Sequence, residues 1–258
     1  MEKIIRSQVY FVGAGPGDPE LITIKGRRIL EQADVVIYTG SLVSIVLVND
    51  LNAEIHDSSG LDLEKITGLM ADAWNLGKKV VRLHTGDPSI YGAIREQMAV
   101  LKKLGIPFDV VPGVSSVTAA AAALKKELTL PGVSQTIIIT RLPGRTPVPE
   151  NENLKSLAAH RATMIIMLSV SMIERVVKDL DEGGYPENTP VAVVEKASWP
   201  EERIIRGTLA TIAEQVKKAG IDKTAVIAVG DVFSDMPVTE LSKLYDRDFS
   251  HGFRGQCC

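Results

Sequence analysis

The stretch FVGAGPGDPELITIKG, residues 11–26, decides how the rest of the chain is interpreted. A short apolar run typical of a strand leads into a loop with glycines at positions 13, 15 and 17. Alternating glycines after a strand let the backbone approach a ligand or another loop closely. The sequence therefore raises one question at once: which ligand this loop serves.

The loop fails the test for a pyrophosphate. In the dinucleotide fingerprint G-x-G-x-x-G the third glycine lets the helix pack on the strand, but here that position is Asp18, whose carboxylate repels phosphate. Pro16 and Pro19 also remove two amide donors. We expect the helix to begin only at Thr23, with Thr23 or Asp18 as caps. A ligand without phosphate is favoured; a turn that merely leaves the strand is the alternative.

Composition narrows the function classes. The 258 residues are 45% hydrophobic, enough for a large core, and 29 basic against 32 acidic residues give a net charge of -3. This balance argues against nucleic-acid binding by backbone neutralisation. Cys257 and Cys258 are adjacent and cannot staple a fold. No run has the length of a signal peptide or membrane span, so we expect a soluble cytoplasmic protein that binds neither nucleic acid nor membrane.

Strand-like and helix-like segments alternate along the chain. Helical periodicity covers residues 61–74, with Gly77 as a stop, and resumes after Pro88. Runs rich in β-branched residues predict strands at 9–13, 34–39, 78–83, 107–113, 135–141, 162–168, 190–196 and 224–230. The alternation predicts an α/β protein with largely parallel pairing.

The pattern changes after Val111, where an alanine-rich helix is followed by proline-punctuated units that favour hairpins. We therefore predict an N-terminal α/β domain over residues 1–113 with a largely parallel sheet. A C-terminal α/β domain with a mixed sheet should cover residues 114–240, and a tail should cover 241–258.

Two further segments could carry chemistry. In LHTGDPSIYG, residues 83–92, Asp87 precedes Pro88 and is predicted to cap a helix that begins there; it either caps only, or also meets a cationic ligand. In PGVSS, Ser115 and Ser116 open a helix and could present hydroxyls and free N–H groups. His84 is expected to be a satisfied structural histidine.

Metal and nucleophile patterns are absent from the sequence. The four histidines have no ligand spacing, the body of the chain has no paired cysteines, and no G-x-S-x-G elbow occurs. We expect no metal site and assign no catalytic residue.

Together these segments resemble the tetrapyrrole (corrin/porphyrin) methyltransferase family. VGAGPGDPELITIKG, TGDPSIYG, PGVSS and PVAVVEKASWPEERIIRGTL carry the resemblance in the expected order, over residues 9 to about 232. ADVVIYTGSLV, HTGDPSIYGAI and LYDRDFSHGFR resemble the subgroup of cobalamin (vitamin B12) biosynthesis that methylates C11 of precorrin-4 or its cobalt form.

The resemblance implies two α/β domains with a cleft between them, S-adenosylmethionine as methyl donor, S-adenosylhomocysteine as product, and a homodimer. Carried over by motif, the cofactor pocket comprises Pro16, Thr85, Gly86, Asp87, Ile90, Ser115, Ser116, Met167, Leu168 and Ala197. Relatives often have Gly-Gly-Asp where this chain has Thr85-Gly86-Asp87, and Glu-Asn-Gly-Thr where it has Glu195-Lys196-Ala197-Ser198. The methyl group of Ala197 could alter the backbone contact made there.

The implied reaction is a direct displacement, in which a nucleophilic ring carbon of the reduced tetrapyrrole attacks the sulfonium methyl. Alignment and removal of water serve such a reaction, so no protein nucleophile is expected. The polycarboxylate substrate needs cations, and the predicted substrate-binding residues are Arg27, Arg141, Arg145 and Lys196. Alternatives are a uroporphyrinogen-III or other precorrin C-methyltransferase, an NAD-dependent oxidoreductase and a non-catalytic corrinoid carrier.

Overall fold

The computed structural model describes residues 8–235, 242–245 and 249–250, and these form two compact units. The first unit holds the chain up to Ala119 together with Lys196–Glu202, and the second holds Ala120–Glu195 and the chain from Arg203 on. The domain boundary predicted between residues 113 and 114 stays a prediction. Most of the predicted tail, including Cys257 and Cys258, lies outside the described residues.

The first unit is built on a five-stranded sheet in the order β3-β2-β4-β1-β5. Every neighbouring pair in it is parallel, as the alternation of strands and helices predicts. The strands are β1 (Val9–Gly13), β2 (Val35–Tyr38), β3 (Glu54–Asp57), β4 (Val80–His84) and β5 (Phe108–Val111). β1, β2 and β4 are buried along their whole length. The sequences of β1 and β2 are accordingly apolar throughout, whereas β4 also buries Arg82 and His84.

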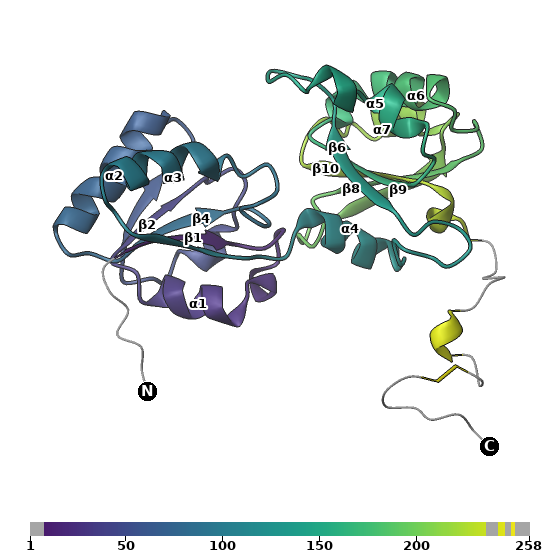
Figure 1. Cartoon of the computed structure of the whole chain (residues 1–258). Helices are drawn as coiled ribbons and strands as arrows, with labels where there is room; N and C mark the ends of the chain where they lie inside the picture. Colours follow the sequence, from purple (N-terminus) through teal and green to yellow (C-terminus); the bar gives the residue numbers. More distant parts are fainter. Residues whose placement is uncertain (1–7, 236–241, 246–248, 251–258) are drawn as a thin grey trace. The chain divides into compact units, whose positions relative to one another are not determined.

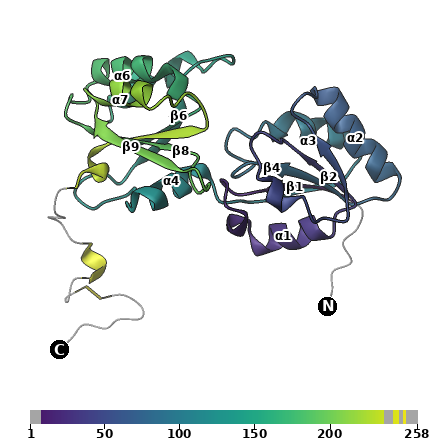
Figure 2. The ribbon, with the colours of Figure 1, turned by 180° about the vertical axis from the view of Figure 1, so that it is seen from behind.

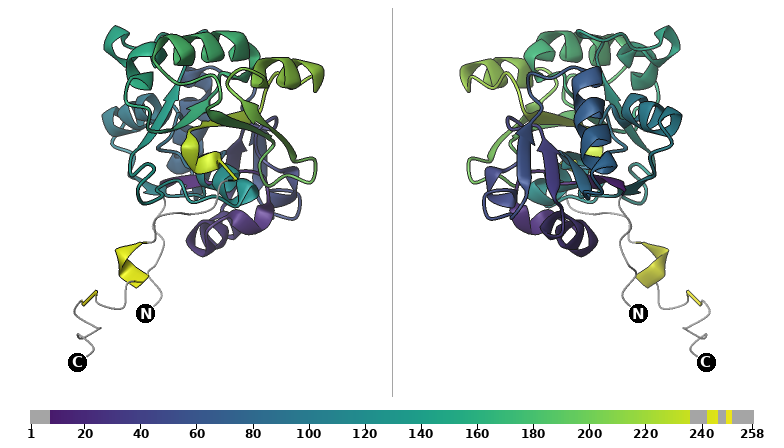
Figure 3. Two further views of the ribbon diagram at one scale, coloured as in Figure 1. Left: turned by 90° about the vertical axis from the view of Figure 1, so that its right-hand side faces the viewer. Right: turned by 90° about the vertical axis from the view of Figure 1, so that its left-hand side faces the viewer.

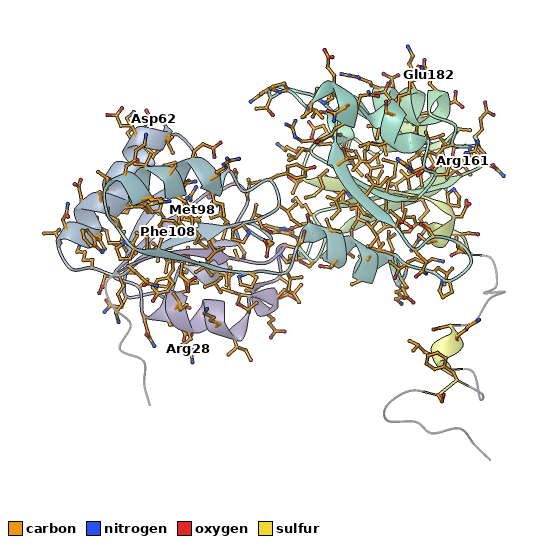
Figure 4. The ribbon with its side chains drawn as sticks, in the orientation of Figure 1. Arg28, Asp62, Met98, Phe108, Arg161 and Glu182 are labelled. Atoms are coloured by element: carbon orange, nitrogen blue, oxygen red, sulfur yellow. The ribbon has the colours of Figure 1, made fainter. Side chains whose placement is uncertain are left out.

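Helices cover both faces of this sheet. Helix α1 (Ile24–Glu31) lies on one face, and α2 (Leu63–Asn75) and α3 (Ile94–Lys103) lie on the other (Figure 1). The view from behind and the two side views show the same arrangement (Figures 2 and 3). Met98 and Phe108 pack between α3 and the sheet (Figure 4). Each helix therefore buries its apolar stripe against a sheet face, as an amphipathic helix must.

The predicted elements of the first unit are confirmed except at two places. α1 begins after Thr23, whose hydroxyl accepts from Gly26 N at 3.0 Å, and Asp18 caps the 3₁₀ turn Pro19–Leu21 by accepting from Glu20 N at 2.8 Å. Strand β3 was missed, because this edge strand is mostly exposed and lacks an apolar run. The helix expected to begin at Pro88 begins only at Ile94.

The second unit has a mixed sheet in the order β6-β7-β10-β8-β9. β6 and β7 pair in parallel, and the other neighbours are antiparallel. The strands are β6 (Ile137–Arg141), β7 (Thr163–Met167), β8 (Pro190–Glu195), β9 (Arg203–Thr208) and β10 (Ala225–Val229). A parallel first sheet and a mixed second sheet confirm the predicted α/β fold class.

Helices α5 (Leu154–Ala158), α6 (Ile173–Glu182) and α7 (Ile212–Lys218) cover one face of the second sheet (Figure 1). Helix α4 (Ser116–Leu124) crosses from one unit to the other in sequence, and its residues 120–124 lie on the opposite face. Buried side chains of α5–α7 and the strands, such as Ile166, Leu180 and Val193, form a continuous core. Within the described ranges, no helix is both long and apolar enough to cross a membrane.

A cap on α2 tests whether this helix is held as the structure indicates. The Asp62 carboxylate accepts from Lys65 N at 2.9 Å at the first turn. Replacing Asp62 with Ala should lower the free energy of unfolding by about 1 kcal/mol, whereas Asp62→Asn should be close to neutral because asparagine caps equally well. Urea unfolding of the three proteins measures the difference, and equal losses in both variants would contradict the cap.

Candidate active site

Three neighbouring strands of the first sheet are followed by loops that lie at the same edge of the sheet, at the carboxyl ends of the strands. β4, β1 and β5 are adjacent and parallel, so the loops that follow them leave from the same carboxyl ends. We name these loop A (residues 14–23), loop B (residues 85–93) and loop C (residues 112–115). In open α/β sheets this edge is where ligands bind. The predicted motifs GPGD, TGDPSI and PGVSS therefore lie side by side.

Loops A and B are joined by main-chain hydrogen bonds. Gly15 and Gly86 form an antiparallel bridge, in which Gly86 N donates to Gly15 O at 2.7 Å and Gly15 N donates to Gly86 O at 3.3 Å. Ala14 N also donates to His84 O at 2.7 Å. The entrances of the two loops thus form one short continuation of the sheet.

Two glycines, Gly13 at the end of β1 and Gly113 in loop C, let the backbone at the start of loops A, B and C come into direct contact. A Cβ atom on Gly13 would lie 2.5 Å from Gly113 Cα and 2.7 Å from Gly86 O. A Cβ atom on Gly113 would lie only 2.2 Å from Gly86 O. No side chain fits at such separations, so glycine is required at Gly13 and Gly113 for the site to form.

The Asp87 carboxylate fastens loop B to loop C. It accepts from Gly113 N at 2.9 Å, from Ser89 N at 2.8 Å and from the Ser89 hydroxyl. Partial burial alone would raise the pKa of Asp87, but these hydrogen bonds outweigh it and hold the pKa below its ordinary value. Asp87 is therefore an anion at neutral pH.

The prediction that Asp87 caps a helix starting at Pro88 is wrong. Residues 88–91 form turns, and α3 begins at Ile94 after the left-handed Ala93. The carboxylate instead accepts from the N–H two residues on, the local bond that aspartate makes in tight turns. A cap and a turn begin with the same residue pair, Asp-Pro, so the sequence alone did not separate them.

A segment distant in sequence completes loop A. Residues 196–202, named segment D, follow β8 in the chain but belong to the first unit. Trp199 Nε1 donates to Pro16 O at 2.8 Å, and Asp18 N donates to the Ser198 hydroxyl at 3.0 Å. A Cβ atom on Gly17 would overlap the Trp199 ring, at 2.1 Å from Cδ1. The third glycine of the opening loop therefore makes room for an indole.

Left-handed backbone is frequent in and beside the predicted cofactor motifs of both units. Eight described non-glycine residues have a positive φ, and five of them lie in or beside the predicted cofactor motifs: Tyr91, Ala93, Leu168, Lys196 and Ser198. The remaining three are Lys125, Arg161 and Thr224. Left-handed backbone costs side-chain-bearing residues about 1–3 kcal/mol and concentrates at functional sites.

His84 and Arg82 are buried beneath loop B. Burial lowers the pKa of His84 to about 3, with a further contribution from the charge of Arg82, so the imidazole is neutral. Its Nε2 has no hydrogen-bond partner within the described part of the chain, and the expectation of a satisfied histidine is wrong. So low a pKa makes His84 a poor proton acceptor at neutral pH.

Besides Arg27, nine of the predicted site residues belong to the first unit: Pro16, Thr85, Gly86, Asp87, Ile90, Ser115, Ser116, Lys196 and Ala197. The structure brings most of them to the loops just described. The Ser115 hydroxyl accepts from Val117 N at 3.2 Å as α4 begins. Ala197 is buried, with 5% exposure, and the Lys196 ammonium lies 3.7 Å from Glu201.

Arg27 also belongs to the first unit but lies on α1, where its guanidinium pairs with Glu31 at 2.7 Å. It lines a groove of about 580 Å³ together with Ile24, which is 89% exposed. Arg28, in the same groove, extends from α1 away from the sheet (Figure 4).

Four predicted residues belong to the second unit: Arg141, Arg145, Met167 and Leu168. Arg141 and Met167 are register partners on β6 and β7. The Arg141 guanidinium donates to Thr146 O at 3.2 Å and to Pro147 O at 2.7 Å, so it shapes the loop that carries the exposed Arg145. Leu168 is 66% exposed.

Sequence reasoning missed several residues of the site. Ser89, Gly113, Ser198 and Trp199 all make the contacts above. Of these, only the contact of Asp87 with Ser89 is local enough that its spacing in the sequence could have indicated it. Trp199 lies 183 positions from Pro16 in sequence, and Ser198 lies 180 positions from Asp18. Pairings so distant are invisible to motif spacing.

The charge of the loops restricts what they can bind. Loops A, B and C contain Asp18, Glu20 and Asp87 but no lysine or arginine. Such loops suit a cation or zwitterion and repel a pyrophosphate. In the described residues, no group of three His, Cys, Asp or Glu side chains is placed to hold a metal ion.

Comparison with known proteins places these features in a family. The sequence pattern of the Tetrapyrrole (Corrin/Porphyrin) Methylases matches residues 8–213. The chain belongs to this family. The matched residues include loops A, B and C of the first unit and segment D.

Relatives within the tetrapyrrole methylases are similar along almost the whole chain. A cobalt-precorrin-4 C(11)-methyltransferase of Methanocaldococcus jannaschii is 61% identical over 249 residues, covering 96% of both chains. A solved cobalt precorrin-4 methyltransferase has a TM-score of 0.86 and 48% identity, covering 88% of this chain and 96% of its own. A uroporphyrin-III C-methyl transferase from Thermus thermophilus, complexed with S-adenyl homocysteine, has a TM-score of 0.75 and 31% identity, covering 88% and 93%.

Substitution of Gly113 tests the contact of the three loops. Gly113→Ala should lower the free energy of unfolding by about 3 kcal/mol, because its methyl group would collide with the Gly86 carbonyl. Gly68→Ala is the matched control: it lies inside α2 with open space around its Cβ position, so it should be neutral or stabilising by up to about 1 kcal/mol. Denaturant unfolding compares both variants with the parent, and equal effects would contradict the contact.

The lowered pKa of Asp87 predicts a pH-dependent contribution to stability. A carboxyl whose folded pKa lies below the unfolded value of about 3.9 stabilises the protein above that pH, and the stabilisation is lost as pH falls through the folded pKa. Asp87→Asn should therefore cost about 1 kcal/mol at pH 7, with the gap closing below about pH 4. Urea midpoints of both proteins across this range measure it, and a gap independent of pH would refute the role.

Proposed function

We propose that this chain is an S-adenosylmethionine-dependent methyltransferase that methylates C11 of cobalt-precorrin-4 in cobalamin biosynthesis, with cobalt-free precorrin-4 as the alternative substrate. The observation that carries the proposal is 61% identity to a relative named for that reaction, over 96% of both chains. The relatives named for precorrin-4 without cobalt are 41–48% identical, and a second relative named for the cobalt form is 48% identical. The preference for the cobalt form therefore rests on the relative at 61%.

The residues at the carboxyl edge of the first sheet fit such a donor. S-adenosylmethionine, when bound, supplies a sulfonium methyl group that a nucleophilic ring carbon displaces. Loops A, B and C supply carboxylates, carbonyl groups and closely approachable glycine backbone without a basic side chain. Asp87 is anionic at neutral pH and would attract the positive groups of the donor.

The chain's own residues act on the reaction mainly by positioning. Asp87, Ser89 and Gly113 hold loops B and C at a fixed separation. Trp199 and Ser198 fix the path of loop A. Groups locked in this way can hold a donor in one orientation without reorganising during transfer. Because the electron pair of the broken C–S bond would pass to the sulfur, the chain would need no acidic residue for the leaving group.

The remaining site residues stay proposals that rest on the family resemblance. Met167, Leu168 and Ala197 are proposed to bind the donor together with the residues of loops A, B and C. Arg27, Arg141, Arg145 and Lys196 are proposed to bind carboxylates of the tetrapyrrole. We also propose a homodimer located in the cytoplasm, which light scattering of the purified protein and cell fractionation would test.

The proposed reaction is tested by locating the new methyl group. The purified protein is incubated with ¹³C-methyl-labelled S-adenosylmethionine and, in parallel, with cobalt-precorrin-4 and precorrin-4. We expect one labelled methyl group at C11 in the NMR spectrum, formed faster on the cobalt substrate. A reaction without protein serves as the blank, and Gly68→Ala as a variant distant from the loops.

Other outcomes would identify the alternatives. Label at another ring carbon would indicate a uroporphyrinogen-III or other precorrin C-methyltransferase. Binding of the macrocycle without transfer of label would indicate a corrinoid carrier. Quenching of tryptophan fluorescence by NADH but not by S-adenosylmethionine would indicate a nicotinamide-dependent enzyme.

A further inference from the structure

Arg82 is a buried cation without a carboxylate partner. It lies in the central part of β4 with 5% exposure, and no ion pair found in the described residues includes it. Its Nη1 donates to Ile37 O at 3.2 Å on the neighbouring strand β2, and its Nε donates to Gln97 Oε1 at 3.4 Å. Both acceptors found for Arg82 in the described part of the chain are therefore neutral.

Gln97 connects Arg82 to the end of loop B through a second hydrogen bond. It lies on α3 with 5% exposure, and its Nε2 donates to Ala93 O at 3.2 Å. Ala93 is the residue before α3, and its φ of 48° is left-handed. The hydrogen bonds therefore run from the backbone of β2, through Arg82 and Gln97, to the point where loop B becomes a helix.

Loop B is held at both ends. Its beginning is fixed by Gly86 and by the three hydrogen bonds of Asp87. Its end contains two left-handed residues, Tyr91 and Ala93, with Gly92 between them. A Cβ atom on Gly92 would lie 2.2 Å from Pro88 O, so the loop folds tightly back on itself. The Arg82–Gln97 contact supports this strained end.

Packing alone does not account for the pair. The same side of the sheet also holds the buried His84, and the rest of its core is apolar, including Val80, Met70 and Leu101. Apolar side chains of similar size in place of a buried polar pair are often neutral or stabilising, because no charge then has to leave water. A buried arginine and glutamine at these two positions therefore point to a role other than filling space.

We propose that Arg82 and Gln97 are positioning residues that set the conformation of loop B and thereby the affinity for the methyl donor. The donor part of this inference rests on the proposed function. Neither side chain touches the donor in this proposal. Both act through Ala93, which fixes where Ile90 and Asp87 lie relative to the start of α3.

The test separates positioning from stability with two variants. Gln97→Met keeps the volume of the side chain and removes both of its hydrogen bonds. The double variant Arg82→Met/Gln97→Met also removes the buried charge. We expect Gln97→Met to lower Tm, and the double variant to regain most of that loss. Both should bind S-adenosylhomocysteine roughly tenfold more weakly in calorimetry, the factor expected when one loop-fixing hydrogen bond is lost.

A control and a second readout complete the experiment. Leu101→Val lies on the same helix in the apolar core, and it should lower Tm without changing affinity for S-adenosylhomocysteine. Hydrogen exchange of the amides in loop B should become faster in both Met variants and stay unchanged in Leu101→Val.

Recovery of affinity together with Tm in the double variant would overturn the proposal, because the pair would then act only through stability. Unchanged exchange in loop B would overturn it as well. Failure of the proposed function would show separately, as a parent protein that binds no S-adenosylhomocysteine, and the exchange measurement still decides whether the pair shapes loop B.

Discussion

Three stretches of backbone meet at Gly13, Gly86 and Gly113 more closely than any side chain permits. The rest of the candidate site depends on this contact. Parallel pairing of β4, β1 and β5 delivers the three loops to one edge, but only the missing Cβ atoms let them join. Once they are joined, one carboxylate, Asp87, can bridge two of them through hydrogen bonds to Ser89 and Gly113. The sheet topology thus brings the loops together, the glycines allow their contact, and that contact places the Asp87 carboxylate in the site.

The contact also accounts for the chemical character of the edge. A phosphate site of the dinucleotide type needs free amides at a helix N-terminus. Here Gly15 N and Gly86 N donate hydrogen bonds between loops A and B, and Gly113 N donates to the Asp87 carboxylate, so these amides are not free. The loops therefore offer a carboxylate and carbonyl oxygens, and they lack basic side chains. A donor that carries positive charge and no phosphate suits that inventory, in agreement with membership of the tetrapyrrole methylases.

The sequence predicted the parts of the molecule whose causes are local. Buried strands such as β1 and β2 are recognisable by continuous apolar runs, and Thr23 caps α1 as expected, whereas Asp18 caps the preceding 3₁₀ turn instead. Strand β3 was not predicted, because an exposed edge strand needs no run of apolar residues. The start of α3 was misplaced because Asp-Pro can open a turn as well as a helix. The three predicted loop motifs do lie at one edge of the sheet, whereas the contact of Trp199 with loop A was not predicted, because Pro16 lies 183 positions away in sequence.

The grouping of segment D with the first unit has a consequence for how the protein is made. A ribosome releases the chain from its N-terminus, so residues 8–119 emerge long before residues 196–202. Until then the Pro16 carbonyl and the surface of Gly17 have no indole against them. The nascent first unit can build its sheet and helices, but it acquires the final form of its opening loop only after β8, an element of the second unit, has been synthesised.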